Sequence, residues 1–391
     1  MANIKLVIGN GFDMFCKLQS SYNDYFMSDS YKNDIFLDWI KKFKNNAIDF
    51  LDDKNEKRME KWIKFEKFEY ANIWDFFFYL RSNVYDDDQK KWRWCDIESE
   101  IFSSLCNVDK NDVYNNRFKW DMVLHTISSG FAVFDKIYEV NILSSVILMK
   151  RDFKKFSNES DFYYFLLDEL KKFEKNFGKY IAEKRHLNED GNKIKSFFAN
   201  GFQINSEKTI HQLIGNDRLV SIDSFNYDDV DIIEYNKILH NINGNIRNPI
   251  FGIDSTLCDV DNPKFIFTKT NRRLELDMIE DRHFVDAKFE EIVVFGHSLN
   301  KSDYNYFFPL FDKIGIADFS STTKIIFGFA IYNPKEEYEI RKNLRLGIQE
   351  IFEAYAKYKG FKDYNRMLDS LTTQGRVITR EINNKGYVET V

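Results

Sequence analysis

Hydrophobic residues follow two different patterns along the chain. The positions at which one pattern gives way to the other divide the sequence into regions. The run Ile4–Ile8 is mostly apolar and ends at Gly9, which is typical of a strand buried on both faces of a parallel sheet. From about residue 22 to about residue 216, apolar residues recur instead at three- and four-residue steps, as in the set Phe162, Phe165, Leu166, Phe173 and Phe177. That spacing predicts a long series of amphipathic helices.

Strand patterns return after residue 216. The predicted strands are Arg218–Ile222, Ile238–Asn243, Pro249–Ile253, Glu291–Phe295, Lys324–Phe329 and an edge strand, Arg376–Ile382. Helical patterns follow two of these strands, at Asp303–Ile314 and Lys335–Leu344. Strands that alternate with helices predict a parallel sheet.

These patterns predict an α/β fold. In the predicted fold, a Rossmann-like parallel sheet is interrupted after its first βα unit by a large α-helical insertion, and the C-terminal region of the chain is helical. Residues 1–25 and 216–391 are expected to form one discontinuous nucleotide-binding domain, and residues 26–215 the helical insertion. Because Ile4–Ile8 has no partner strand nearby in the sequence, we expect it to pair with strands from the C-terminal half.

Composition and charge argue against several classes of protein. Gly and Pro number 16 and 4 among 391 residues, so tight turns should be few and helices long. The formal charge is −6, which gives no basic surplus for nucleic acid. The four cysteines show no CxxC spacing, so we expect no metal site and a reducing compartment. The N-terminal apolar run is too short for a signal sequence and no apolar stretch approaches 20 residues, so we expect a cytoplasmic protein without a membrane partner.

The first candidate motif is the turn Gly9-Asn10-Gly11-Phe12-Asp13, directly after the first predicted strand. Two glycines allow a tight turn and a close approach of the backbone to a ligand, so the turn could cradle a phosphate or, through Asp13, hold a ribose hydroxyl. The alternative is a plain strand-to-helix turn with Asp13 as the helix N-cap.

Two further candidates follow later strands. Asn226, in the run Ser224–Asp228, has both a donor and an acceptor at a strand end, where ligands collect in such sheets, although an Asx turn is the commoner fate of such a residue. His240 begins the run His240–Asn245, which includes Asn243 and Gly244. It could be a general base or merely a hydrogen-bonded histidine in a strand.

The best-placed candidate is the run Gly296-His297-Ser298-Leu299, followed by Asp303. It places a base, a hydroxyl and an acid at one edge, directly after a strong strand. The alternative is that Ser298 or Asp303 only caps the next helix. No G-x-S-x-G motif is present, which disfavours a serine hydrolase.

An aromatic and acidic cluster, Trp94-Cys95-Asp96-Ile97-Glu98, lies inside the helical region. Trp94 and Glu98 are four residues apart and therefore share one helix face. Spacing alone favours a half-buried helix face over a catalytic role.

With these residues in view, the chain resembles the AbiH family of bacteriophage abortive-infection proteins. The blocks that carry the resemblance, in order, are Gly9–Asp13 with Leu18 and Ser20–Tyr25, Trp94–Glu98, Ser224–Asp228, Asn243-Gly244 with Phe251–Asp254, Phe267–Thr270, and Gly296–Leu299 with Asp303. They span nearly the whole chain, and the two end blocks are the most specific.

At greater distance the layout is similar to sirtuin-like NAD-consuming domains. That likeness implies Asn226 as the catalytic asparagine. It implies Gly9, Asn10 and Gly11 near the pyrophosphate of NAD, and Gly296, Ser298 and Asp303 near a ribose or the adenine. Asn243 stands where related proteins carry His, and Lys17 stands where many carry Gly. The usual base is therefore missing, and His297 is our first choice to replace it, ahead of His240.

Two functions follow from the resemblance. One is an NAD glycohydrolase that depletes NAD during phage infection, with a catalytic set of Asn226, His297 and His240. The cofactor-binding set would be Gly9, Asn10, Gly11, Phe12, Asp13, Asn243, Gly244, Gly296, Ser298 and Asp303. The other is a nucleotide-sensing module without turnover. The expected partners are a nucleotide, a phage-derived trigger and further copies of the chain, whereas a nuclease is disfavoured.

Overall fold

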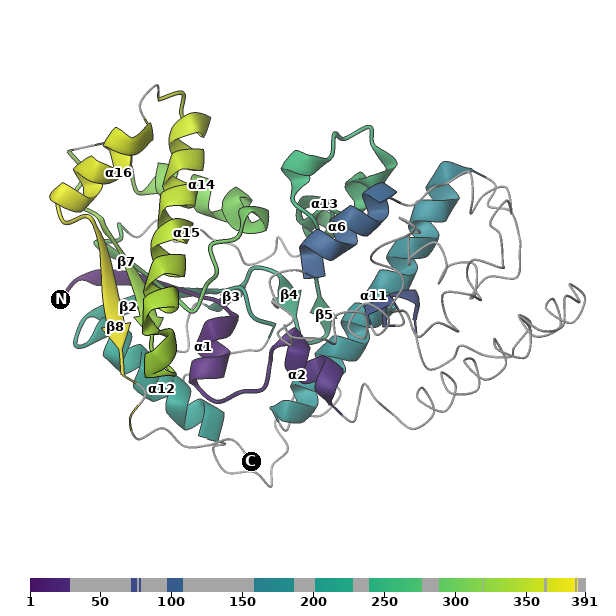
Figure 1. The fold of residues 1–391 in the computed structure, drawn as a ribbon, viewed down its shortest axis with the longest axis horizontal. Helices are drawn as coiled ribbons and strands as arrows, with labels where there is room; N and C mark the ends of the chain where they lie inside the picture. Colours follow the sequence, from purple (N-terminus) through teal and green to yellow (C-terminus); the bar gives the residue numbers. More distant parts are fainter. Residues whose placement is uncertain are drawn as a thin grey trace, which may run out of the picture.

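The structure of the chain is a computed structural model (Figure 1). It describes residues 1–28, 72–75, 77–78, 97–107, 158–185, 201–227, 239–275, 288–318, 320–361, 364–383 and 385. Of the cluster Trp94–Glu98, only Ile97 and Glu98 fall within these ranges, and Asp228 lies outside them.

A six-stranded parallel sheet forms the centre of the fold, as the sequence predicts. Its strands, in spatial order, are β3 (Leu239–Asn241), β2 (Arg218–Ser224), β1 (Asn3–Ile8), β6 (Glu291–Phe295), β7 (Lys324–Ala330) and β8 (Val377–Ile382). The N-terminal strand lies between β2 and β6, so the pairing expected for it is confirmed. Chain order reverses around β1, and ligand crevices of such sheets lie at this reversal.

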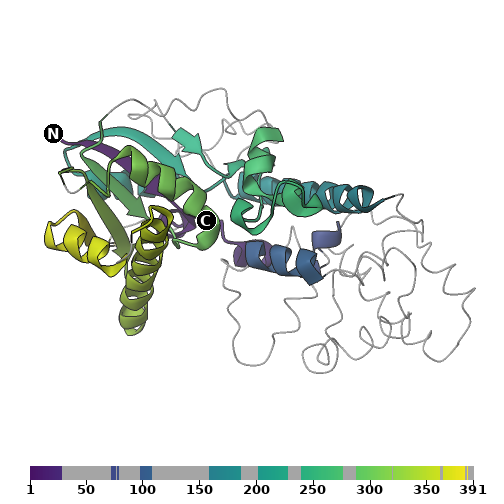
Figure 2. The same ribbon diagram turned by 90° about the horizontal axis from the view of Figure 1, so that it is seen from above.

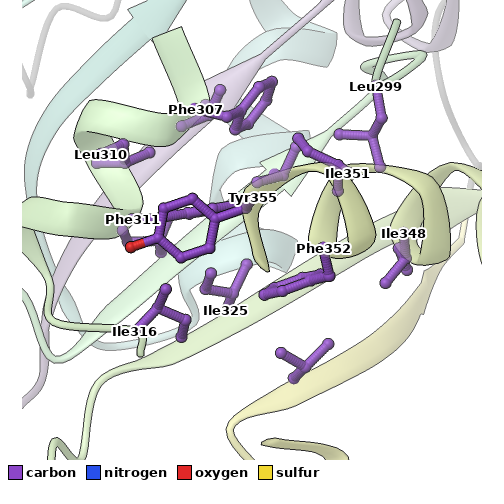
Figure 3. Packing of buried hydrophobic residues seen from close by; sticks show 14 of the residues in the cluster. Leu299, Phe307, Leu310, Phe311, Ile316, Ile325, Ile348, Ile351, Phe352 and Tyr355 are labelled. Atoms are coloured by element: carbon purple, nitrogen blue, oxygen red, sulfur yellow. The ribbon is translucent and has the colours of Figure 1, made fainter. Parts of the chain in front are cut away.

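Helices cover both faces of the sheet, because successive strand residues point to opposite sides. On one face, Leu6 and Ile8 contact a layer from α1 (Asn10–Phe15) and α12 (Gly201–Ile214). On the other face, Val7 faces α14 (Tyr304–Lys313), α15 (Glu337–Tyr358) and α16 (Tyr364–Thr373). Figure 3 shows this second layer, in which Phe311 stacks on Phe352 with ring centroids 5.1 Å apart.

The remaining described helices lie beside the sheet domain (Figures 1 and 2). They are α2 (Tyr22–Met27), α6 (Ile97–Asn107), α11 (Glu159–Lys184) and α13 (Lys269–Glu275). Aromatic side chains hold α2 and α11 together. The ring centroid of Tyr25 lies 6.0 Å from that of Phe173 and 5.3 Å from that of Phe177. The apolar positions predicted for the 162–177 segment are buried there, apart from half-exposed Phe165.

One predicted strand is wrong. Within 249–253, only Pro249 is in a strand, and β5 (Asn248–Pro249) pairs in antiparallel fashion with β4 (Gly244–Asn245) in a small hairpin outside the sheet. The hairpin packs on α11 so closely that a Cβ on Gly178 would lie 2.1 Å from the Ile246 carbonyl oxygen. Burial against a helix produced the same apolar pattern as burial in a sheet.

For other elements, the observed boundaries differ from the predicted ones, but the predicted type of element is correct. α15 runs 14 residues past Leu344, the predicted end, because Ile348, Ile351 and Phe352 continue its buried face. α12 falls in the range assigned to the insertion but packs on the sheet through Ile210 and Leu213. In the part of the chain that the structure describes, no helix has the length and apolarity needed to span a bilayer.

Candidate functional site

A cleft opens at the carboxyl ends of β1, β2 and β6. Loops after these strands form its floor, and residues of α2, α6, α11 and α13 close its sides. The lining residues are Gly9, Asn10, Asp13, Ser20, Tyr22, Glu98, Ile181, Phe225, Asn226, Tyr227, Asn243, Lys269, His297, Ser298, Asn300, Ser302 and Asp303. About 660 Å³ between them, including the mouth, is free of protein atoms.

Asp13 and Asn226 form a buried pair on the cleft floor. The Asn226 Nδ2 donates to Asp13 Oδ1 at 2.6 Å and to the Gly9 carbonyl at 3.2 Å. Both side chains are almost fully buried. The Asn226 Oδ1 has no hydrogen-bond partner among the described residues. A buried acceptor left without a donor costs free energy, so this oxygen marks a place for a ligand hydroxyl or amine.

The two glycines of the first turn have a packing role. The Gly9 and Gly11 amides donate to the carbonyls of Phe295 and Gly296, and the Phe12 amide donates to the Gly9 carbonyl. These three N–H groups are therefore used within the protein, and a phosphate would need other donors.

Asp13 is not the N-cap of the helix, since Gly9 holds that position and Asp13 lies in the first turn of α1.

We predict that Gly296→Ala unfolds the junction of these turns. Gly296 has a φ of +68°, and a Cβ there would lie 2.1 Å from the Phe12 backbone nitrogen. Gly215 has a φ of +60° with no atom within 4 Å, so Gly215→Ala should cost only about 1–2 kcal/mol of unfolding free energy. Gly296→Ala should cost on the order of 3–4 kcal/mol or more. Equal urea midpoints for the two variants would contradict this.

A chain of charged side chains forms the opposite wall of the cleft. The Lys269 Nζ, from α13, lies 2.9 Å from Glu98 Oε1 and 2.7 Å from Asp303 Oδ1. Asp303 Oδ2 lies 3.4 Å from His297 Nε2. Asp303 occupies the N-cap position of α14, but its side chain makes no capping bond. The carboxylate therefore pairs with Lys269 and His297 in the cleft and does not cap the helix.

Burial and neighbouring charges determine the protonation states of the ionisable side chains that line the cleft. Burial raises the pKa of Glu98 and Lys269 opposes that rise, so this carboxyl takes up a proton more readily than usual. Burial also disfavours the charged form of Asp303, but Lys269 and His297 outweigh it and hold its pKa well below the usual range. Burial raises the pKa values of Tyr22 and Tyr227, whose hydroxyls lie 3.2 Å apart and stay protonated.

Lys269→Met should destabilise the protein by about 3–5 kcal/mol at pH 7, because it leaves Glu98 and Asp303 buried without their cation. The difference from wild type should narrow only as the pH falls below about 4. A carboxyl with a lowered folded pKa contributes stability above its unfolded pKa, near 3.9, and loses it as the pH falls toward the folded value, which for Asp303 lies well below the usual range. Chemical denaturation at pH 7 and at about pH 2.5 measures both effects, and an undiminished difference at about pH 2.5 would contradict the pairing.

His297 lines the cleft, but its ring is held on both sides. Its Nδ1 accepts from the Leu299 amide at 2.9 Å, which leaves the proton on Nε2, facing Asp303. Phe225 packs on the ring with centroids 4.3 Å apart, and the side chain is 3% exposed. Leu299 has a φ of +56°, an uncommon conformation for leucine, which aims its amide at the ring.

The sequence-predicted site residues divide into three groups. The cleft brings together Gly9, Asn10, Asp13, Asn226, Asn243, His297, Ser298 and Asp303. Gly11, Phe12, Gly244 and Gly296 shape the surrounding turns without lining it. His240 lies elsewhere, in a second cavity beside Asp223.

Asn243, which stands at the expected histidine position, is fixed by its neighbours. Its Oδ1 accepts from Arg273 at 3.3 Å, and its Nδ2 lies 3.5 Å from the Phe225 carbonyl. The Arg273 guanidinium also donates to the Ile242 carbonyl at 3.0 Å. These bonds hold the loop after β3 against the cleft.

Sequence reasoning assigned no site role to Glu98, Lys269, Tyr22 or Tyr227. Glu98 was noted in the aromatic and acidic cluster Trp94–Glu98, for which spacing favoured a half-buried helix face, and Lys269 appeared only in the family-like block Phe267–Thr270. Their partners lie 34 or more residues away in the chain, so spacing could not reveal the pairing.

The chain matches no protein-family model, no curated protein and no solved structure. The resemblance to AbiH proteins therefore rests on the blocks quoted above. Within the described residues, no group of three or more His, Cys, Asp or Glu side chains is arranged to hold a metal ion.

Proposed function

We propose that the cleft binds NAD by its nicotinamide ribose and hydrolyses the bond between that ribose and nicotinamide. The observation that carries the proposal is the unpartnered Oδ1 of Asn226, buried beside the Asp13 carboxylate where β1 and β2 end. A ribose supplies hydroxyl donors at the spacing of neighbouring ring carbons, which suits an amide oxygen next to a carboxylate.

The charges of the cleft suit a reaction in which positive charge develops on a sugar. Breaking the glycosidic bond gives the ribosyl carbon oxocarbenium character. Asp13 and Asp303 both line the cleft and both are buried, so water screens their charge little. NAD carries a pyridinium, which leaves as neutral nicotinamide and needs no proton.

Glu98 is the proton acceptor in this proposal. A water oxygen bonds to the ribosyl carbon as the bond to nitrogen breaks, and the proton that the water loses passes to a base. Burial raises the pKa of Glu98, and a base becomes more effective as its pKa approaches the working pH. His297 was the first choice from sequence, but its Nδ1 lone pair is taken by the Leu299 amide. We assign His297 the positioning of Asp303.

The resemblance to AbiH proteins supports a role in phage defence, in which NAD loss halts the infected cell. Cells that express the chain should then resist phage, and their NAD level should fall after infection. Full resistance with an unchanged NAD level would separate defence from this chemistry.

A second candidate is nucleotide sensing without turnover. The observation that favours it is Asn243, which cannot act as the base that related proteins carry and is locked by Arg273. The cleft would then bind the nucleotide and pass the signal to the helical part.

One experiment separates the candidates. Purified protein is incubated with millimolar NAD, products are separated by chromatography, and thermal unfolding is followed with NAD and with ADP-ribose. Hydrolysis predicts nicotinamide and ADP-ribose in equal amounts. Sensing predicts ligand stabilisation without products. A protein that does neither would overturn both proposals.

A further inference from the structure

Two tyrosines that line the cleft form a hydrogen-bonded pair with a defined direction. The Tyr22 hydroxyl, from α2, lies 3.2 Å from the hydroxyl of Tyr227, which follows β2. The Tyr227 hydroxyl also lies 3.3 Å from the Ile250 carbonyl, and a carbonyl can only accept a hydrogen bond. Because a phenol has one proton, Tyr227 donates its proton to Ile250, and Tyr22 donates to Tyr227.

This direction leaves the Tyr22 oxygen as an acceptor. Its only proton is committed to Tyr227, and the oxygen accepts no hydrogen bond within the part of the chain that the structure describes. A phenolic oxygen can still accept from a donor while its own proton is in use. A ligand group that contacts this oxygen therefore has to supply the proton of the hydrogen bond.

The rings of both tyrosines are fixed by the same two phenylalanines. The Tyr22 ring lies 5.2 Å from Phe177 of α11 and 5.1 Å from Phe251, centroid to centroid. The Tyr227 ring lies 5.6 and 5.4 Å from the same two rings. This packing holds the Tyr22 hydroxyl in place before a ligand binds, so the ligand does not have to order it.

Two carboxyls lie within electrostatic reach of these hydroxyls. Burial is the main reason why the pKa values of Tyr22 and Tyr227 are raised, and the charges of Glu98 and Asp303 add to the rise. Both carboxyls line the same cleft. A ligand group with a negative charge is repelled at this position, whereas a neutral group with N–H donors is not.

We propose that Tyr22 selects the carboxamide of nicotinamide by accepting a hydrogen bond from its amide nitrogen, and that the cleft thereby rejects the nicotinic acid ring. This inference rests on the function proposed above, which brings nicotinamide into the cleft. A carboxamide offers two N–H donors, whereas an ionised carboxylate has only acceptors. The two groups have nearly the same shape, so the direction of the hydrogen bond and the charge distinguish them.

The test is the binding of free nicotinamide and free nicotinic acid to the whole chain at neutral pH, followed by ligand-observed NMR. Wild type should bind nicotinamide at least about tenfold more tightly. Tyr22→Phe keeps the ring and removes the hydroxyl, so it should weaken nicotinamide binding about three- to tenfold and leave nicotinic acid binding within about twofold. Tyr338→Phe, at an exposed position of α15, should keep the wild-type ratio.

Three results would overturn the proposal. They are a wild type that binds neither compound, a wild type that binds both equally well, and a Tyr22→Phe variant that keeps the wild-type ratio of affinities. The first two need no variant, so a substitution that impairs folding does not prevent the test.

Tyr227→Phe tests the direction of the hydrogen bond. It removes the group that takes the Tyr22 proton, so the Tyr22 hydroxyl can then donate to a ligand. The affinity for nicotinic acid should rise about threefold or more relative to that for nicotinamide. An unchanged ratio would show that the hydroxyl direction does not select the ligand.

The binding measurements involve no turnover, so the two proposals fail separately. If the affinities follow the expected ratio but NAD is not hydrolysed, the chemistry proposed above is wrong and the selection by Tyr22 stands. If wild type hydrolyses NAD and nicotinic acid adenine dinucleotide with equal kcat/KM, the hydrolysis stands and the selection is wrong.

Discussion

Asn226→Ala should lower kcat/KM for nicotinamide release from NAD by about 10²–10³, because the substitution removes both the acceptor for a ribose hydroxyl and the donor that positions Asp13. The variant should also lose about 1–3 kcal/mol of stability, since Asp13 then remains buried with one donor fewer. Initial rates at several NAD concentrations measure the first effect, and chemical denaturation measures the second.

Asn333→Ala is the matched control for this variant. Asn333 caps the short helix η5 (Pro334–Glu336), is exposed, and does not line the cleft. Its loss should leave kcat/KM within a factor of two. If Asn226→Ala folds and keeps the rate of this control, the cleft floor is not the ribose site.

Glu98→Gln is expected to reduce kcat by about 10²–10⁴, the usual contribution of a general base, while ADP-ribose binding changes little. In wild type, kcat should rise with pH as Glu98 loses its proton. Because burial raises the pKa of Glu98, that rise should lie above the ordinary glutamate value of about 4.3. The variant should lack the rise.

Glu100→Gln provides the control on the same helix, two positions along, where the side chain does not line the cleft. It should keep the wild-type kcat and pH profile. A Glu98→Gln variant with full kcat would remove Glu98 from the chemistry. A larger loss in His297→Ala, with the pH-dependent rise abolished, would return the role of base to His297.

Much of the fold could be predicted because burial in a parallel sheet leaves a local signature. β6 coincides with the predicted Glu291–Phe295, and β1 extends the predicted strand by one residue, because both strands are apolar on two faces and end at glycine. The strand predicted at Pro249–Ile253 failed because Ile250 and Phe251 are buried outside the sheet, where Phe251 packs on Phe173 and Phe177 of α11.

The floor of the cleft could also be predicted, since each of its loops follows a strand and parallel strands end at one edge. Its wall could not. Glu98 and Lys269 come from α6 and α13, and only tertiary packing brings them together. The tautomer of His297 depends on the single backbone amide of Leu299, whose left-handed conformation has no sequence signal.

The central claim is that the Asn226 Oδ1 accepts a hydrogen bond from a hydroxyl of the nicotinamide ribose. A comparison of two enzymes, each with three substrates, tests it most directly. Wild type and Asn226→Ala are each assayed with NAD and with NAD analogues that lack the 2′- or the 3′-hydroxyl of that ribose. For one of the two analogues, wild type should lose at least tenfold in kcat/KM relative to NAD, and Asn226→Ala should lose less than twofold, because the bond is already gone. Equal losses in the two enzymes for both analogues would show that Asn226 does not contact the ribose and would contradict the claim.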